Sequence, residues 1–269
     1  MIFGQINIAK MSVNSEMALK KFILENDVLL MAIQETGNWN HSANGAPGYS
    51  AFHKAGDLNK GTAGVALLIH PTLEPEPIYE LNDDDEMDTI WCQIKIRGKR
   101  HLVGSVYCKP SQNVANNIAA FKNLTDSIDK ARTYKKKHNF NSLLIYGDYN
   151  ARHSEWGDHE TKSRGAKLLE YVQSNDITIC SPFDCTFVCT NGGSVIDLML
   201  AEGPIVSHLG TQWMDKDVEL FSGAPRRGHY PVLQEVHKNM KKSETIPKRC
   251  LDWKMLIGAN GLMTLKEVV

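Results

Sequence analysis

The sequence predicts an α/β domain in which two packed β-sheets are covered by helices. Short apolar runs typical of strands recur along most of the chain, and three helical patterns separate some of them. Many strands with a few interspersed helices are typical of two sheets that pack face to face beneath helices. The expected strands are Ile2–Ile8, Val28–Ile33, Gly64–Ile69, Thr89–Ile96, Leu102–Tyr107, Ser142–Tyr146, Ser194–Leu200 and Tyr230–Val236.

Three segments have the apolar spacing of helices. The first begins at Asn14 or Ser15, either of which can cap it, and it ends at Asn26. The second covers Val114–Tyr134, and the third covers Ser163–Gln173. Each helix should pack an apolar face on a sheet. The residues expected on these faces are Met17, Leu19, Phe22, Ile23, Leu24, Ile118, Phe121, Leu124, Ile128, Leu168, Leu169 and Val172.

The strand Thr89–Ile96 has an alternating pattern. The residues on its apolar side are Ile90, Cys92, Ile94 and Ile96. The polar side chains of Gln93 and Lys95 point to the opposite side. We therefore expect one face of this strand to be buried and the other to be exposed to solvent, as in an antiparallel sheet.

The composition is that of a globular chain without an overall basic surface. Its 269 residues carry a formal net charge of -1, so any nucleic-acid contact would come from local patches. The six cysteines include no C-x-x-C pair, which argues against a zinc ribbon and favours a reduced, intracellular compartment. No signal peptide is visible, and no apolar run approaches the ~20 residues of a membrane span.

We expect the compact domain to cover residues 1–238. The segment from 238 to 248 is polar and charged, and the segment that follows is weakly patterned. Residues 239–269 are therefore interpreted as a linker or as the start of a further segment.

Five apolar runs end in or contain polar residues. These residues are Asn7, Glu35, Asp148 with Asn150, Asp197 and His229. A carboxylate inside or directly after a buried strand costs several kcal/mol unless it is paired or bound to a metal. Five such stretches in one domain predict a shared polar cleft at the strand ends, where sites in layered α/β folds lie.

These residue types suit metal-assisted cleavage of a phosphodiester. Carboxylates and amides form a hard, oxygen-rich ligand set, which favours Mg²⁺ or Mn²⁺ over zinc. Glu35 would hold the metal, and Asp148 and Asn150 would position the attacking water. His229 would shuttle a proton, and Asp197 would hold its imidazole in the required tautomer.

Several segments resemble the endonuclease/exonuclease/phosphatase superfamily. They are QET near the start, GDYNARHSEWG, SVIDLML and HYP. The stretch GDYNARHSEWGDHETKSRGAKLLEYVQSNDI resembles in particular the endonuclease domains of non-LTR retrotransposons, and so do Thr186–Leu198 and the later KRCLDWKML. The resemblance spans nearly the whole chain, and its motifs are specific in combination.

The resemblance implies a four-layered αββα sandwich with two mixed, mainly antiparallel sheets flanked by helices. It implies a nuclear, Mg²⁺-dependent endonuclease that nicks double-stranded DNA and leaves a 3′ hydroxyl for target-primed reverse transcription. A reverse transcriptase would follow in the same polyprotein. The isolated domain is expected to be monomeric and not bound to a membrane.

The resemblance also implies roles for single residues. Asn7 and Glu35 would hold the metal. Asp148 and Asn150 would orient the nucleophile and the phosphate, and Tyr107 would contact the scissile phosphate.

In the same family pattern, Asp197 would pair with His229. Beside them, Arg226 and Arg227 are candidate contacts to the DNA phosphates, because they lie next to His229.

Each site residue also has a purely structural interpretation. The alternatives are a turn former for Asn7, a surface acid for Glu35, a packing residue for Tyr107, an Asx turn for Asp148 and Asn150, a structural buried pair for Asp197 and a core position for His229. The combination of all of them in one chain favours catalysis.

One position departs from the family pattern. The family's last motif reads Ser-Asp-His, whereas this chain reads Arg227-Gly228-His229. The missing aspartate normally serves the metal side of the site, so its loss should weaken the affinity for the metal, and the protein should need more Mg²⁺ or prefer Mn²⁺. Two rival interpretations are an abasic-site repair nuclease or phosphoesterase of the same superfamily, and a non-catalytic nucleic-acid-binding module.

Overall fold

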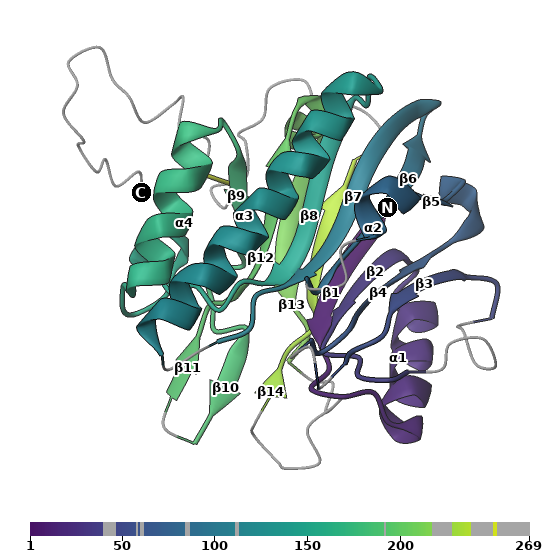
Figure 1. The fold of residues 1–269 in the computed structure, drawn as a ribbon. Coiled ribbons are helices and arrows are strands. Elements are labelled where there is room, and N and C mark those ends of the chain that lie inside the picture. Colours follow the sequence, from purple (N-terminus) through teal and green to yellow (C-terminus); the bar gives the residue numbers. More distant parts are fainter. Residues whose placement is uncertain are drawn as a thin grey trace, which may run out of the picture.

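A computed structural model shows four layers, in which two β-sheets pack face to face and helices cover their outer faces (Figure 1). The structure describes residues 1–39, 47–57, 59, 62–83, 87–110, 113–190, 192–216, 228–237 and 250–251. Among the helices of these residues, none is long and apolar enough to cross a membrane. The αββα sandwich expected from the sequence is confirmed. The linker expected over residues 239–269 lies outside the described residues, except for residues 250–251.

The first sheet has six strands in the order β13-β15-β1-β2-β4-β3. Strands β1 and β2 run parallel, and the other neighbouring pairs are antiparallel. The strands are β1 (Ile2–Asn7), β2 (Val28–Gln34), β3 (Ser50–Lys54), β4 (Val65–Ile69), β13 (Leu209–Met214) and β15 (Val232–Val236).

The second sheet has seven strands in the order β16-β9-β12-β8-β7-β6-β5. Only β7 and β8 run parallel among its described pairs. The strands are β5 (Glu76–Pro77), β6 (Thr89–Ile96), β7 (Lys99–Tyr107), β8 (Ser142–Asp148), β9 (Thr178–Cys180), β12 (Asp197–Glu202) and β16 (Cys250–Leu251).

A small third sheet lies at one end of the sandwich, at the bottom of Figure 1. Its strand order is β11-β10-β14. The strands are β10 (Phe187–Cys189), β11 (Gly192–Ser194) and β14 (Gly228–His229). Since β14 is hydrogen-bonded to β10, this sheet carries His229 to the end of the two large sheets.

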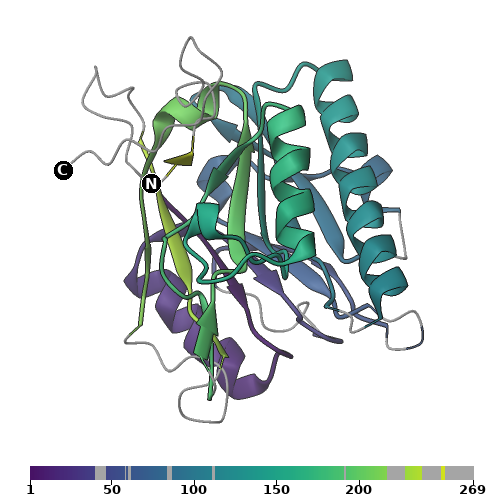
Figure 2. The ribbon, with the colours of Figure 1, turned by 90° about the vertical axis from the view of Figure 1, so that its left-hand side faces the viewer.

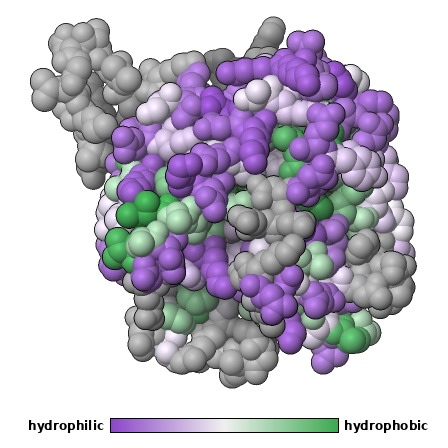
Figure 3. Space-filling view, in the orientation of Figure 1, coloured by the Kyte–Doolittle hydropathy of each residue, from purple (hydrophilic) through white to green (hydrophobic). Residues whose placement is uncertain are grey.

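Helices cover both outer faces of the sandwich. Figure 2 shows α1 on one side of the sheets and α3 and α4 on the other. The face that carries α3 and α4 is mainly hydrophilic, with small, separate apolar patches (Figure 3). The helices are α1 (Val13–Glu25), α2 (Tyr79–Asn82), α3 (Val114–Lys137) and α4 (Ser163–Ser174), and the 3₁₀ turns are η1 (Pro71–Leu73), η2 (Ser154–Trp156) and η3 (Pro204–His208).

The alternation of side chains along the strands produces three apolar layers. Phe3, Leu67 and Val103 belong to the layer between the two sheets. Ile6 belongs to the layer beneath α1, and Leu102 belongs to the layer beneath α3 and α4. Because successive strand residues point to opposite faces, β1 and β7 each contribute to two of these layers.

The expectation that β6 has one solvent-exposed face is wrong. Gln93 is only 5% exposed, and its neighbour Trp91 is fully buried. Trp91 packs with Ile78 and Met87, in the layer that α2 and α3 cover. Gln93 donates from Nε2 to Glu76 Oε2 at 2.9 Å, which allows its amide to be buried. The polar residues on this face have partners and can be buried, so the alternation pattern wrongly indicated that the face is exposed to solvent.

Helix α1 begins earlier than the sequence pattern indicates. Ser12 is its N-cap and forms a reciprocal capping box, in which Ser15 N donates to Ser12 Oγ at 3.1 Å and Ser12 N donates to Ser15 Oγ at 2.8 Å. Met17 and Leu24 of α1, and Ile118 of α3, are exposed although we expected them to be buried. The buried faces of α1 and α3 are therefore narrower than the positions of their apolar residues indicated.

Strand register brings polar side chains together at one end of the sandwich. Tyr107, Asp148 and Asp197 are successive register partners on β7, β8 and β12. In the facing sheet, Asn7 ends β1 and Glu35 directly follows the parallel strand β2. Residues of β1 contact β8 and β12 across the sandwich, so the two polar rows lie opposite each other.

A buried histidine in β7 makes stability sensitive to acid. Burial lowers the pKa of His101 to about 4, and the nearby His208 and Lys99 act in the same direction. Because the folded-state pKa is depressed from 6.5, the unfolded chain binds a proton first as the pH falls, and stability is lost between about pH 6.5 and 4. This term amounts to about 2 kcal/mol at pH 5.

Lowering the pH from 7.5 to 5 should reduce the free energy of unfolding of both proteins. We expect this reduction to be about 2 kcal/mol smaller in His101→Gln than in the parent. Urea unfolding at both pH values measures the difference, and each protein serves as its own reference at pH 7.5. Equal losses in the two proteins would contradict the assignment.

Candidate active site

The side-chain amide of Asn7 joins the two sheets. Its Nδ2 atom donates to Glu35 Oε1 at 2.6 Å and to Asp148 Oδ2 at 2.9 Å. Its Oδ1 atom accepts from the backbone N–H of Ala9 at 2.9 Å, which sets the direction of the amide. Asn7 and Asp148 are buried and Glu35 is half-buried. One amide thus holds two carboxylates that come from facing sheets.

Tyr107 adds a further contact to Glu35, which is already bonded to Asn7. Its hydroxyl hydrogen-bonds to Glu35, and the ring lies in the apolar layer between the sheets. Burial raises the pKa of Tyr107 far above its usual value, and the charges of Glu35 and Asp148 add to this effect. The hydroxyl therefore stays protonated and donates to Glu35. Tyr107 is both a packing residue and a neighbour of the site.

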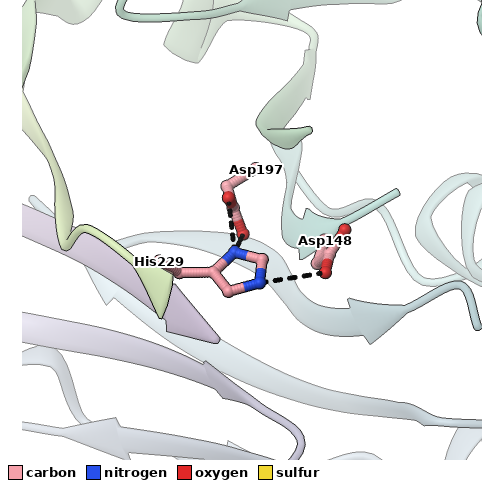
Figure 4. Close-up of side chains that lie close together, drawn as sticks. All are labelled: Asp148, Asp197 and His229. Carbon is pink, nitrogen blue, oxygen red and sulfur yellow. Dashed lines mark hydrogen bonds and ion pairs between the residues drawn. The ribbon is translucent and has the colours of Figure 1, made fainter. Parts of the chain in front are cut away.

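His229 lies between two carboxylates of the second sheet (Figure 4). Its Nδ1 atom is 2.8 Å from Asp197 Oδ2 and 3.0 Å from Asp197 Oδ1. Its Nε2 atom is 3.8 Å from Asp148 Oδ2. The side chain of His229 is 7% exposed and that of Asp197 is 1% exposed, so this pair is screened little by solvent.

Burial and mutual charge set the protonation of this cluster. Burial raises the pKa of Asp148 to about 7, and the negative charge of Asp197 contributes in the same direction. Burial alone would lower the pKa of His229, but its contacts with Asp197 and Asp148 raise that pKa to about 9. At neutral pH the imidazole is therefore protonated, and its Nδ1–H donates to Asp197.

Asn150 is held by its backbone and by its side chain. Its N–H donates to Asp148 Oδ1 at 2.9 Å, so the Asx-type turn considered for this segment is present. Its Nδ2 atom donates to the carbonyl of Cys108 at 3.2 Å. Asn150 has a φ of 47° and Glu35 has a φ of 55°. Asparagine adopts left-handed backbone readily, whereas glutamate does so rarely, so Glu35 is the more strained of the two.

Two further residues position the Asp197–His229 pair. Thr186 Oγ1 accepts the backbone N–H groups of Ile196 and Asp197, both at 3.1 Å. Phe187 is the register partner of His229, with ring centroids 4.8 Å apart. Both residues fall in the segment that resembles the family, but their own residue types carry no signal for these roles. Arg226 and Arg227, the predicted phosphate contacts, lie outside the described residues.

The donor set fits a hard divalent cation. The described part of the site contains three carboxylates, Glu35, Asp148 and Asp197, and one cationic group, His229. Ligand atoms of Asp148, Asp197 and His229 lie within 4.8 Å of one another. A protonated His229, however, has no lone pair to offer a metal. The carboxylate oxygens of Glu35 and Asp148 are therefore the better cation ligands, while Asn7 presents its Nδ2 to them and its Oδ1 to the Ala9 N–H.

The profile of the endonuclease-reverse transcriptase family matches residues 101–223. Two relatives are RNA-directed DNA polymerases from the mobile element jockey. That of Drosophila funebris is 22% identical over 81% of this chain, and that of Drosophila melanogaster is 23% identical over 85%. The chain spans about a fifth of the length of these relatives, 22% and 23% respectively.

Solved structures share the fold. The endonuclease domain of TRAS1, a telomere-specific non-LTR retrotransposon, has a TM-score of 0.67 and 17% identity, and the match covers 88% of this chain and 97% of that domain. The AP endonuclease of Leishmania major has a TM-score of 0.66 and 14% identity, covering 88% of each chain.

The family match and the two relatives support the resemblance of this chain to the endonuclease/exonuclease/phosphatase superfamily, and the solved structures share its fold. The same matches support the resemblance to the endonuclease domains of LINE-type, non-LTR retrotransposons. The resemblance that the sequence motifs indicated is thus confirmed. The roles of the individual site residues stay predictions.

The position at which this chain lacks the family aspartate has a backbone that favours glycine. Gly228 has a φ of 138°, a conformation that residues with a Cβ rarely adopt. We expect Gly228→Asp and Gly228→Ala each to destabilise the protein by about 1–3 kcal/mol, because both introduce this strain. Thermal melts of the two variants measure the effect. Unchanged stability of Gly228→Asp would contradict it, and a loss confined to Gly228→Asp would indicate charge repulsion instead of strain.

Proposed function

We propose that this chain is a divalent-metal-dependent DNA endonuclease domain of a non-LTR retrotransposon. It would nick one strand of double-stranded DNA and leave a 3′ hydroxyl that a reverse transcriptase of the same polyprotein extends. This function would place the protein in the nucleus. The observation that carries the proposal is the unbroken series of contacts from Tyr107 through Glu35, Asn7, Asp148 and His229 to Asp197.

Glu35 and Asn7 would hold Mg²⁺ or Mn²⁺ at the half-exposed side of the site. When bound, the cation would supply positive charge that neutralises the phosphate and offsets the excess of carboxylates. The chain's own amide–carboxylate contacts keep these oxygens in place before any substrate arrives. Such preorganisation lowers the cost of ordering the site during the reaction.

Asp148 has the properties of the group that accepts a proton from the attacking water. A pKa of about 7 leaves much of it ionised at neutral pH and still basic enough to take up a proton. The Asn7 amide and the Asn150 N–H each hold one of its oxygens, so its orientation is defined. Asn150 would help to place the water and the phosphate relative to that carboxylate.

His229 would face the phosphate as a cation. With a pKa of about 9 it keeps its proton at neutral pH, and Asp197 fixes the ring through Nδ1. The Nε2–H group, which lies 3.8 Å from Asp148 Oδ2, would then stabilise negative charge that develops on the phosphate or donate a proton to the leaving oxygen. The hydroxyl of Tyr107 would contact the phosphate from the side of Glu35.

The central test removes the predicted metal ligand while keeping its shape. We expect Glu35→Gln to lower Mg²⁺-dependent nicking of supercoiled plasmid by at least about 100-fold, with the melting temperature close to that of the parent. Isothermal titration should show that Mg²⁺ affinity falls as well. Glu74→Gln is a matched control, because Glu74 is an exposed carboxylate paired with Lys95. Parental nicking by Glu35→Gln would refute the metal assignment.

The same assay distinguishes the rival functions. An abasic-site nuclease should cut an abasic duplex far faster than an intact one, and a phosphoesterase should release phosphate from a 3′-phosphorylated end. A non-catalytic module should bind DNA without cutting any of these substrates in Mg²⁺ or Mn²⁺. We expect intact supercoiled DNA to be nicked, with 3′ hydroxyl ends that a polymerase can extend.

The pair Asp197–His229 should act as one unit. Asp197→Asn and His229→Ala should each lower the rate of nicking by about 10²–10⁴-fold, and the double variant should cost little more than either alone. Single-turnover rates of the four proteins give this comparison. Multiplicative losses would show that the two residues work independently.

A further inference from the structure

Arg164, in the first turn of α4, is a buried arginine with an unusual set of partners. It is 4% exposed, and its Nη1 atom donates to the carbonyls of Cys108 at 3.1 Å and Tyr149 at 3.3 Å. Its Nη2 atom donates to the carbonyl of Lys109 at 3.0 Å and to the side chain of Asn117. One guanidinium thus binds the segments that follow β7 and β8, the strands of Tyr107 and Asp148.

Among the residues that the structure describes, the guanidinium has no acidic partner. Among the described residues, no carboxylate lies within ion-pair distance of Arg164, whereas Arg132, a comparable arginine of α3, pairs with Glu202 and Asp129. A buried cation that is balanced only by carbonyl dipoles is rare, because desolvation of the charge is costly.

The neighbouring glycine allows this approach. A Cβ at Gly165 would lie 1.9 Å from the carbonyl oxygen of Arg152, so the start of α4 packs directly on the segment that follows Asn150. Lys162 N also donates to the Arg152 carbonyl at 2.9 Å. The Arg-Gly pair therefore fixes how close the helix comes to that segment.

Arg164 shares a partner with a predicted site residue. The carbonyl of Cys108 accepts from Arg164 Nη1 at 3.1 Å and from Asn150 Nδ2 at 3.2 Å. With one amide hydrogen of Asn150 bound to this carbonyl, the amide oxygen and the second hydrogen remain for the substrate. The place of the Cys108 carbonyl therefore determines where Asn150 presents its amide.

We propose that Arg164 is a positioning residue that sets the orientation of Asn150 through the Cys108 carbonyl, and this inference rests on the proposed nuclease function. The fork of the guanidinium holds both segments at once. A lysine would keep the positive charge but could not reproduce several directed bonds. Misplacement of a catalytic group by about 1 Å costs on the order of 100-fold in rate.

The test is a double-variant cycle on plasmid nicking with Mg²⁺. We expect Arg164→Lys to lower kcat by about 10- to 100-fold with little change in KM. In the background of Asn150→Ala the same substitution should change kcat by less than about 3-fold, since the group that Arg164 positions is gone. Equal losses in both backgrounds would overturn the proposal.

Arg132→Lys is the matched control, because Arg132 is also largely buried and bonds to a backbone carbonyl, that of Asn175. It should leave kcat at the parental level. A similar loss of kcat in Arg132→Lys would show that loss of packing, not positioning, causes the effect, and this too would overturn the proposal.

A second measurement keeps the inference separate from the proposed function. If the parent does not cut DNA, the nuclease proposal fails, but the orientation of Asn150 can still be observed by NMR. The side-chain NH₂ resonances of Asn150 should shift in Arg164→Lys and not in Arg132→Lys. Unchanged Asn150 resonances in Arg164→Lys would overturn the positioning role, whether or not the protein is a nuclease.

Discussion

The concentration of like charge at one end of the sandwich is the constraint on which the site depends. Glu35, Asp148 and Asp197 would repel one another and would resist burial. Two groups reduce this repulsion. The Asn7 amide donates to Glu35 and Asp148, and the His229 imidazolium lies between Asp148 and Asp197. The remaining negative charge is what a divalent cation would offset.

The sequence predicted the large elements well because they repeat a physical pattern. Fully buried strands of five or more residues, and helices with a regular apolar face, leave a signal in a single chain. The apolar pattern did not predict β3 and β13, which are only partly buried at the two edges of the first sheet. The very short strands of the third sheet do not, and β14 has only two residues, Gly228 and His229. Periodicity also could not show that α2 and α3 cover the second face of β6, because the alternation along one strand does not record which elements pack on its polar side.

The polar residues at strand ends could be recognised in the sequence because burial of a polar or charged side chain costs free energy unless it has a partner. Their grouping is a matter of register, which places Tyr107, Asp148 and Asp197 in one row. Supporting residues such as Thr186 and Arg164 could not be found in the same way. Their partners are backbone groups, and any sequence offers those at every position. Geometry alone separates such residues from ordinary helix or turn residues.

The pairing of β1 with β15 has a consequence for the order in which the protein can be completed. Ile2 pairs with Glu235, and Gln5 pairs with Val232, in the interior of the six-stranded sheet. A ribosome would have to release residues up to Val236 before β1 acquires this neighbour. His229 would join the site at nearly the same time, because it lies only four residues before Leu233, the register partner of Gly4 in β1. Newly made chains would therefore carry no assembled site until nearly all of the sandwich had emerged, so activity would begin only after synthesis of the whole domain.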